Sequence, residues 1–402
     1  MTITDPATEA ATSLSQRFKV VDADTHVIEP ADLWTSRVSV AKWGDRVPHV
    51  RWDEENQEDA WYFGDSRLSA VGGGAMAGWS EYPPAHPRRL SEVDPALWNA
   101  PDRLKLMDEY GIHAQILYPN VAGFGTGHFL GLKDPELMLR CIQAYNDFQT
   151  DWASADPQRL LPMTALPFWD LEASVAEMKR TKALGHRGVI MAQEPEYFGQ
   201  PLLADRYWDP VWRTAQDLGM PINFHIASGD LSLMQKVIPE NGEQANYASF
   251  GVSFFMGNSR SLATIICAGI CHRFPRLNFV SVESGIGWIP YALAALDWQW
   301  KNCGVPQEHP EYDLLPSEYF QRQIYGCFWF ERETAMQAIE LLGSDNILFE
   351  TDFPHPTSMA PGPATAAIRP DLYIDEAFKD VPLETMSKIL HDNAARIYHL
   401  DD

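Results

Sequence analysis

Positively charged residues are scarce in this chain of 402 residues. Lys and Arg together number 31, against 55 Asp and Glu, which gives a formal net charge of -24 at pH 7. A chain with this charge is repelled by the phosphates of nucleic acids and by anionic membrane surfaces. We therefore expect neither nucleic acid nor a membrane as a partner.

Cysteines and long apolar segments are scarce as well. The chain has 5 cysteines, and the spacing of Cys267 and Cys271 suits one face of a helix better than a zinc knuckle. No segment approaches the roughly 18 consecutive apolar residues of a membrane-spanning helix. Residues 1–17 lack the apolar stretch of a secretory signal. We expect a cytoplasmic protein with reduced thiols.

The residues after the first predicted strand lack glycine, and this absence bears on the fold. Short apolar segments, typical of buried strands, alternate with amphipathic helices. Strands are predicted at 19–24, 113–118, 160–166, 188–192, 221–226, 277–283, 323–328 and 346–352. Helices are predicted at 101–110, 135–154, 171–184, 208–218, 258–273, 290–300, 331–342 and 383–398.

Two α/β folds compete for this alternation of strands and helices. A doubly wound open sheet predicts a glycine-rich phosphate loop after its first strand, but residues 25–30 contain no glycine. Near-continuous apolar strands that alternate with helices are expected in a closed parallel barrel. The sequence therefore predicts an α/β fold, a (β/α)8 TIM barrel, as a single domain over residues 1–402.

Residues 29–99 interrupt the alternation. The segment contains six tryptophans and the triplet Gly72-Gly73-Gly74. Its aromatic content argues against disorder, and irregular loops of this length are usually functional. We predict a lid insertion after the first strand that covers the barrel mouth and presents an aromatic side chain to the pocket. The alternative is a surface segment that buttresses the barrel wall.

The most informative motif is Asp24-Thr25-His26, at the end of the first predicted strand. Side chains two residues apart on a strand point the same way, so Asp24 and His26 can close on one cation. The alternative is an ordinary strand end with a capping Asp and a surface His. In a parallel barrel, catalytic groups lie at the C-terminal ends of strands. Three later predicted strands also end in residues that bind divalent cations, namely His225, Glu283 and Asp352.

These segments together resemble the amidohydrolase superfamily, in its branch related to aminocarboxymuconate-semialdehyde decarboxylase. The resemblance covers nearly all of residues 20–400 apart from the insertion. It rests on Asp24-Thr25-His26, Phe224-His225, Arg273-Phe274-Pro275-Arg276-Leu277, Thr351-Asp352-Phe353-Pro354-His355 and Asn393-Ala394-Ala395-Arg396-Ile397-Tyr398. It implies a (β/α)8 barrel that carries a divalent metal ion, for which we expect zinc, with manganese as the alternative.

Carried over by position, the resemblance implies Asp24, His26, His225 and Asp352 as the metal ligands. Asp24 stands where many members have His and some decarboxylases have Glu. Glu283 stands where many decarboxylases of this branch have a catalytic His. A Glu at this position is compatible with a metal ligand, a general base or a general acid.

The predicted carboxylates bear on the reaction. If Asp24, Glu283 and Asp352 all ionise, they outweigh one dication by about one charge, which opposes a carboxylate substrate. We therefore expect a metal-dependent hydrolase whose activated water cleaves a C–N or activated C–C bond of a small, aromatic, carbonyl-containing substrate, with Asp352 or Glu283 as base. The alternatives are a non-oxidative decarboxylase of an aromatic or enoic acid and a catalytically inactive scaffold.

Four further residues are candidates for the pocket. Tyr118, which ends the second predicted strand, and His128, in the loop after it, are candidates for substrate contact. Arg332, after the seventh strand, is either a carboxylate anchor or only a charge at a helix start. His355 is expected to orient a metal ligand from behind, with a loop histidine bonded to backbone as the alternative. We also expect the chain to form a homodimer.

Overall fold

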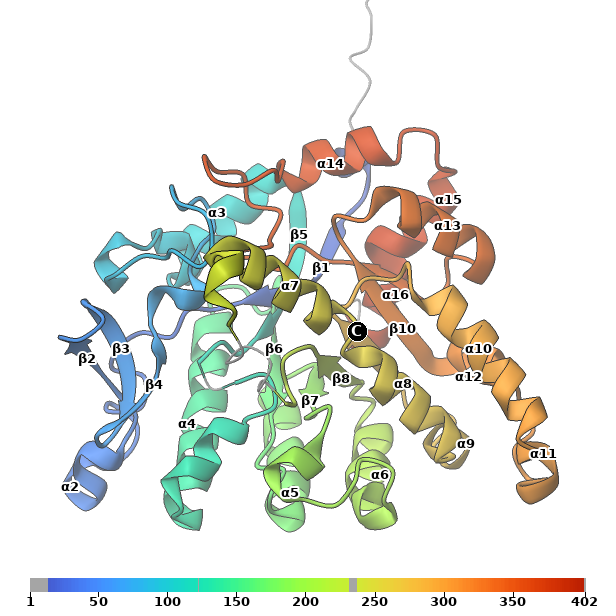
Figure 1. The fold of residues 1–402 in the computed structure, drawn as a ribbon, viewed down its shortest axis with the longest axis horizontal. Coiled ribbons are helices and arrows are strands. Elements are labelled where there is room, and N and C mark those ends of the chain that lie inside the picture. Colours follow the sequence, from blue (N-terminus) through green and yellow to red (C-terminus); the bar gives the residue numbers. More distant parts are fainter. Residues whose placement is uncertain (1–13, 122, 231–236, 401–402) are drawn as a thin grey trace, which may run out of the picture.

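Eight parallel strands form the centre of the computed structural model, which describes residues 14–121, 123–230 and 237–400 (Figure 1). They lie side by side in the order in which they occur along the chain. The strands are β1 (Val20–His26), β5 (Ile112–Tyr118), β6 (Leu160–Ala165), β7 (Gly188–Ile190), β8 (Ile222–His225), β9 (Phe279–Val282), β10 (Ile324–Phe328) and β11 (Ile347–Phe349). Each overlaps one of the predicted strands, so the predicted fold is confirmed.

The first and last strands meet at their C-terminal ends. The amide of Asp352 donates to Asp24 O (3.0 Å), and the amide of His26 donates to Phe353 O (2.7 Å). Thr25 and Phe353 also form a parallel bridge. This closure brings together the residues after β1 and after β11, which are far apart in the sequence.

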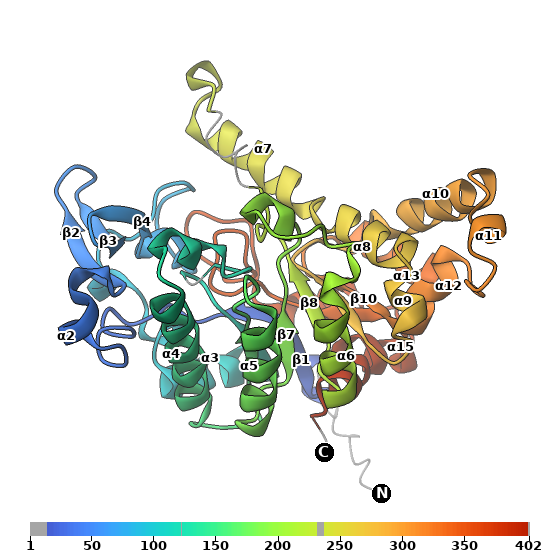
Figure 2. The ribbon, with the colours of Figure 1, turned by 90° about the horizontal axis from the view of Figure 1, so that it is seen from below.

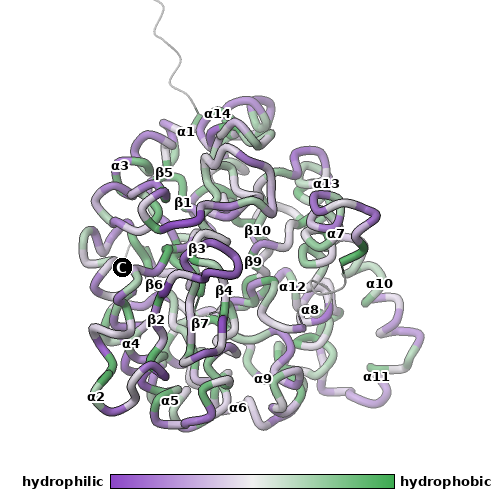
Figure 3. The backbone as a smooth tube through the Cα atoms, turned by 60° about the vertical axis from the view of Figure 1, so that its left-hand side comes forward, coloured by the Kyte–Doolittle hydropathy of each residue, from purple (hydrophilic) through white to green (hydrophobic). Residues whose placement is uncertain are grey.

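The barrel strands are almost completely buried because both of their faces are covered. Side chains such as Val21, Ile116 and Leu348 fill the interior of the barrel. A larger apolar cluster lies between the strands and the surrounding helices. Hydrophobic and hydrophilic stretches alternate along the outer helices (Figure 3), as expected for helices that cover a core on one side.

Sixteen α-helices are present among the described residues. They are α1 (Leu14–Arg17), α2 (Val40–Trp43), α3 (Ala100–Tyr110), α4 (Pro135–Ala153), α5 (Leu171–Ala183), α6 (Asp209–Leu218), α7 (Glu243–Phe255), α8 (Asn258–Cys267), α9 (Ile270–Arg273), α10 (Ile289–Asn302), α11 (Val305–Glu308), α12 (Pro316–Gln323), α13 (Arg332–Leu342), α14 (Pro370–Ala377), α15 (Leu383–Ser387) and α16 (Asn393–Tyr398).

The predicted helices correspond to α3, α4, α5, α6, α8 with α9, α10, α13, and α15 with α16, whereas α1, α2, α11, α12 and α14 were not predicted. Two further differences concern the prediction over 258–273 and helix α7. The expected single helix over 258–273 is divided at Gly269, whose φ of 65° is left-handed and ends α8 before α9 begins. Helix α7 was not predicted, and it extends away from the barrel (Figure 2). Among the described residues, no helix has both the length and the apolar character needed to cross a membrane.

Residues 29–99 form a separate small sheet beside the barrel (Figure 1). Its strands β2 (His49–Asp53), β3 (Glu58–Phe63) and β4 (Ser66–Ala70) are antiparallel. Trp34 and Trp61 are buried with ring centroids 5.0 Å apart, and Trp34 Nε1 donates to Cys141 O of α4 (3.0 Å).

The tryptophans of this segment therefore anchor it rather than serve the substrate. Among the described residues that border the main pocket, the segment supplies Ser69, Ala70, Gly73 and Gly74. No aromatic side chain of the segment is among the described residues that line this pocket, so the predicted aromatic contact is not found there. Closure over the barrel mouth stays a prediction.

Candidate active site

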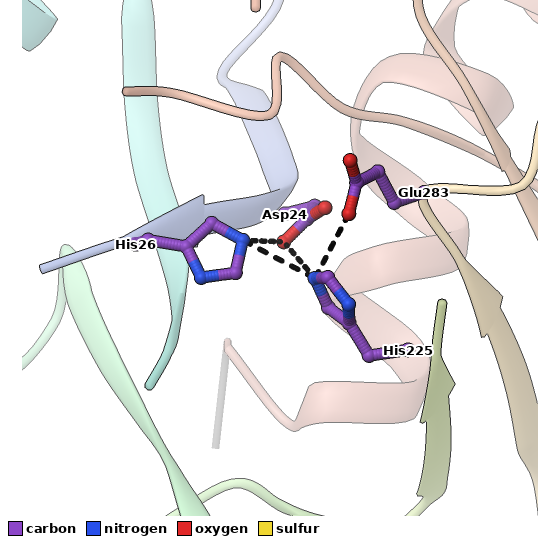
Figure 4. Close-up of side chains that lie close together, drawn as sticks. All are labelled: Asp24, His26, His225 and Glu283. Atoms are coloured by element: carbon purple, nitrogen blue, oxygen red, sulfur yellow. Dashed lines mark hydrogen bonds and ion pairs between the residues drawn. The ribbon is translucent and has the colours of Figure 1, made fainter. Parts of the chain in front are cut away.

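Three of the predicted metal ligands converge at the ends of β1 and β8 (Figure 4). His26 Nε2 lies 3.3 Å from Asp24 Oδ1 and 3.2 Å from His225 Nε2. His225 Nε2 lies 3.5 Å from Asp24 Oδ1. All three side chains are fully buried. The alternation of side chains along β1 thus puts Asp24 and His26 on one side, as the motif predicted.

The hydrogen bonds of the two imidazoles leave their Nε2 atoms free to bind a cation. His26 Nδ1 donates to Pro119 O (2.8 Å) and His225 Nδ1 donates to Ile226 O (2.9 Å), since a carbonyl can only accept. Burial, aided by His355, lowers the pKa of His26 to about 4, so its ring is neutral near pH 7.

Asp24 supplies the charge that a cation needs. Both of its carboxylate oxygens are buried, and neither has a hydrogen-bond partner. Burial opposes ionisation, but the neighbouring His225 and His26 outweigh it and lower the pKa of Asp24. A buried carboxylate beside two Nε2 lone pairs is costly by itself and fits a divalent metal ion.

Asp352 lies on the other side of His26 and is held from two directions. Its Oδ1 lies 3.8 Å from His26 Nε2 and accepts a hydrogen bond from His355 Nδ1 (2.7 Å). Its Oδ2 accepts from Thr357 Oγ1 (2.8 Å). Burial acts to lower the pKa of His355, but the Asp352 carboxylate raises it above its ordinary value.

Glu283 also reaches the cluster. Its Oε2 lies 3.4 Å from His225 Nε2, and its amide donates to Glu350 Oε2 (3.2 Å). Burial, followed by the charges of Asp352 and Asp24, raises the pKa of Glu283 well above its ordinary value. The charge argument for hydrolysis counted Glu283 as an anion, and a raised pKa weakens this premise.

Glu283 and Asp352 share an unusual backbone conformation. Their φ angles are 54° and 56°, in the left-handed region that non-glycine residues seldom adopt. Each residue lies just after a barrel strand, where the chain turns sharply and directs the carboxylate across the barrel mouth. Such conformations persist where the surrounding structure enforces them, and they are concentrated at functional sites.

Two overlapping groups of buried residues can hold a metal ion. In each group the donor atoms lie within 4.8 Å of one another. The first group is Asp24, His26, His225 and Glu283, and the second is His26, Glu283, Asp352 and His355. Three predicted ligands thus share the first group with Glu283, whereas Asp352 shares only the second group with His26. Such buried groups suit a divalent metal ion.

A buried arginine supports the seam, which is the place where β1 meets the residues after β11. Arg103 of α3 is fully buried, and it donates to His26 O (2.8 Å) and Ala96 O (2.7 Å). On the same seam, Asp22 accepts from the amide of Thr351 (2.8 Å) and from its hydroxyl (2.6 Å). The bonds between Asp22 and Thr351 fix the backbone just before Asp24 and Asp352.

A cavity of about 350 Å³ opens next to the cluster. Its aromatic wall comes from the loop after β5 and from α7, through Phe124, Tyr247, Phe250, Phe254 and Phe255. The Phe124 ring lies 4.0 Å from the His225 ring, centroid to centroid. Glu283 and His355 also border the cavity, and no Lys or Arg does so among the described residues. The pocket thus joins a polar floor to an aromatic wall.

Of the three residues predicted to contact the substrate, one lines the pocket and two do not. His128 borders the pocket. Tyr118 is fully buried, and its hydroxyl donates to Asn223 Oδ1 (3.0 Å) inside the barrel. Arg332 is exposed at the start of α13, which agrees with a charge at a helix start. Among the described residues that line the pocket, neither Tyr118 nor Arg332 is present.

Sequence reasoning missed two parts of the site. Asn120 accepts from His355 Nε2 through its Oδ1 (3.3 Å), and its position close to the end of β5 was a usable signal. The aromatic face of α7 was also missed. Tyr247, Phe250 and Phe254 recur at the spacing of one helix face, which is the signal that identifies such a helix.

Comparison with known proteins agrees with this architecture. The sequence profile of the amidohydrolase family matches residues 21–400. A gamma-resorcylate decarboxylase from Polaromonas sp. is 26% identical over 265 residues, which cover 63% of this chain and 76% of the relative. A 2-amino-3-carboxymuconate-6-semialdehyde decarboxylase from Dictyostelium discoideum is 20% identical over 317 residues, which cover 77% of this chain and 79% of the relative.

Solved structures share the fold. An amidohydrolase from Mycobacterium avium subsp. paratuberculosis superposes with a TM-score of 0.74 at 21% identity, covering 95% of this chain and 99% of the other. A dihydroxybenzoic acid decarboxylase from Polaromonas sp., solved with bound manganese and the inhibitor 2-nitroresorcinol, gives a TM-score of 0.61 at 19% identity, covering 96% of this chain and 98% of the other.

Proposed function

The chain belongs to the amidohydrolase family, and from this premise we propose that it is a metal-dependent, non-oxidative decarboxylase of a small aromatic acid. Two findings favour this alternative over the hydrolase expected first. The relatives described above are decarboxylases by name. The hydrolase expectation also rested on an ionised Glu283, whereas burial and neighbouring carboxylates raise the pKa of Glu283.

The observation that carries the proposal is the aromatic pocket directly beside the buried cluster. A benzoate-sized substrate has a flat apolar body and one carboxylate at its edge. The body matches the rings of Phe124 and Phe254, and the carboxylate matches the cluster around Asp24 and His225.

Asp24, His26, His225 and Asp352 are the residues that would hold the metal ion. When bound, the ion would supply positive charge that orients the substrate carboxylate and balances the buried Asp24 and Asp352. The two imidazoles suit zinc, and the carboxylate oxygens suit manganese as well. We propose a divalent ion of this kind, and the choice between the two metals is open to direct metal analysis.

Glu283 is the residue placed to move the proton. It borders the pocket, whereas both carboxylate oxygens of Asp352 already accept hydrogen bonds from His355 and Thr357. In the reaction, the bond between the ring carbon and the carboxylate breaks, and its electron pair stays on the ring carbon. That carbon takes a proton from Glu283 while CO₂ leaves, and Glu283 then regains a proton from solvent.

His355 and Thr357 act through Asp352 rather than on the substrate. Their two hydrogen bonds fix both oxygens of the carboxylate and set its direction. Among the other candidates, His128 is proposed to contact the substrate because it borders the pocket. The homodimer stays a prediction.

Measurement of CO₂ release tests the proposed reaction. The protein, loaded with manganese or with zinc, is incubated with a panel of hydroxybenzoates, and CO₂ and the corresponding phenol are quantified. We expect equal amounts of the two products from at least one acid, and none after the metal is removed with a chelator. The same preparation is also tested with amides and lactones. If it hydrolyses one of them and no acid loses CO₂, the expectation of a hydrolase is right instead.

A further inference from the structure

A second cavity lies beside the catalytic pocket, and the proposed reaction does not use it. Its volume is about 550 Å³. It lies between the C-terminal end of α7, the loop after β10, the segment after His355 and the start of α14. Its largest lining side chains are Phe255, Trp329, Phe330, Met359, Ile368 and Tyr373.

The two cavities share part of their walls. Phe255 and Thr357 border both of them. The Thr357 hydroxyl donates to Asp352 Oδ2 (2.8 Å), and Trp329 Nε1 donates to Thr357 O (3.2 Å). The second cavity thus begins one hydrogen bond away from Asp352.

The chemistry of the second cavity restricts what it can bind. No charged side chain lines it among the described residues. One polar atom stands out, since the hydroxyl of Tyr373 is buried and has no hydrogen-bond partner. Burial is the main cause that raises the pKa of Tyr373, so the phenol keeps its proton and remains a donor. Such a surface suits a neutral apolar group that offers one hydrogen-bond acceptor.

We propose that this cavity binds the distal, uncharged end of the substrate. The inference rests on the proposed function, which places the acid end at Asp24 and His225. The ring then lies against Phe124 and Phe254, and an apolar tail continues past Phe255 towards Tyr373. The substrate class is therefore an aromatic acid that carries an alkyl or aryl tail with an ether or carbonyl oxygen, rather than a small hydroxybenzoate alone.

A competing occupant is a second copy of this chain. Phe330 is 55% exposed and Ile368 is 40% exposed, so the rim of the cavity has apolar surface that another protein is able to cover. The substrate is favoured because the cavity shares Phe255 and Thr357 with the catalytic pocket and because Tyr373, which lines the cavity, has a buried hydroxyl without a hydrogen-bond partner. The experiment includes a measurement that separates the two.

Binding of matched ligands tests the subsite without requiring turnover. Calorimetry on the manganese-loaded protein measures the affinity for three acids. They are 2,6-dihydroxybenzoate, the same acid with a butoxy group on its ring, and the same acid with a pentyl group, which lacks the ether oxygen, at that ring position. We expect both tailed acids to bind at least about tenfold more tightly than the short acid, because burying several methylene groups strengthens binding. The ether should lose severalfold in affinity in Tyr373→Phe, and the pentyl derivative should not.

A substitution that fills the second cavity with a large side chain gives a second comparison of the same affinities. In Ala367→Trp, the new side chain occupies the space of the tail, so the ratio of affinities for tailed and short acids should fall towards one. Ala248→Trp is the matched control, because Ala248 is exposed on α7 and does not line either cavity. Circular dichroism checks folding, and if Ala367→Trp does not fold, the ether and pentyl pair in Tyr373→Phe decides alone.

The outcomes separate this inference from the proposed function. Tailed acids that gain nothing, or a gain that persists in Ala367→Trp, would overturn the subsite even if short acids are decarboxylated. A dimer in light scattering that Ala367→Trp converts to a monomer would assign the cavity to a second copy. If the tail strengthens binding through Ala367 and Tyr373 but no acid releases CO₂, the subsite stands and the proposed reaction fails.

Discussion

The floor and the wall of the catalytic pocket are built in different ways. Asp24, His26 and His225 on the floor lie on barrel strands, and their side chains are fully buried. The wall relies on α7, whose Phe250 and Phe254 are only partly buried and which extends away from the barrel (Figure 2). The floor is held by closed strand pairing, whereas the wall is an appended helix.

This difference separates two tasks of the site. Metal ligation and proton transfer need atoms that are fixed to within a fraction of an ångström, and residues on paired strands provide this. Substrate shape is determined by side chains on a peripheral element, which tolerates change because few other groups depend on it. Changes to the floor should therefore abolish chemistry or stability, and changes to the wall should alter substrate affinity.

The largest expected effect is the loss of a metal ligand on the floor. His225→Ala removes one of the two Nε2 donors, so bound metal should be lost. Activity should fall by more than roughly 100-fold, since even residues that only support a ligand cost about 10–100-fold. Metal analysis by mass spectrometry and CO₂ release measure this. His309→Ala, outside the site, is the control, and normal metal content in His225→Ala would contradict the ligand assignment.

The next effect concerns Glu283, which is also on the floor. Glu283→Gln keeps the shape of the side chain but removes the proton, so activity should fall by roughly 10²-fold, the usual scale for a positioned acid. Bound metal and the melting temperature should stay close to those of the unmodified protein. Turnover near the original rate would leave Asp352 as the proton donor.

A third effect tests the support beneath the floor. Arg103→Met removes buried donors to His26 O and Ala96 O, so the free energy of unfolding should fall by about 2 kcal/mol. Urea unfolding of the metal-free protein measures the change. Arg37→Met is the control, because Arg37 pairs with the exposed Asp151 and should contribute little. Equal losses in the two variants would show that the seam needs no such support.

The smallest effect belongs to the wall. Phe254→Ala removes apolar surface from the pocket, so KM should rise by roughly tenfold with little change in kcat. Val252→Ala, on the outer side of the same helix and 62% exposed, is the matched control. A large fall in kcat with unchanged KM would remove the distinction between floor and wall.

Much of the floor could be predicted from the sequence alone. Each barrel strand is a short apolar segment, and the polar residue that ends it stands out against that background. The rule that catalytic groups lie at the C-terminal ends of barrel strands then brings Asp24, His26, His225, Glu283 and Asp352 together without any coordinates. The pattern is local, so it survives in the sequence.

The raised pKa of Glu283 and the nature of the wall were not predictable in this way. The pKa of Glu283 depends on burial and on Asp352 and Asp24, which lie on other strands. The spacing of Tyr247, Phe250 and Phe254 predicts a helix face, but the same spacing serves a face that packs on a core. Only the folded chain shows that this face borders the pocket.

The sequence by itself determined where the barrel strands lie, how strands and helices alternate along the chain, and which polar residues end the strands. The tertiary structure decided which of these residues share one site, in which direction burial and neighbouring charges shift the pKa values of Glu283 and His355, and which helix lines the pocket. The physical reason is the separation along the chain of the residues that interact. Strand and helix patterns arise between near neighbours in the chain, whereas burial and charge coupling join residues such as Asp22 and Thr351, which are 329 positions apart.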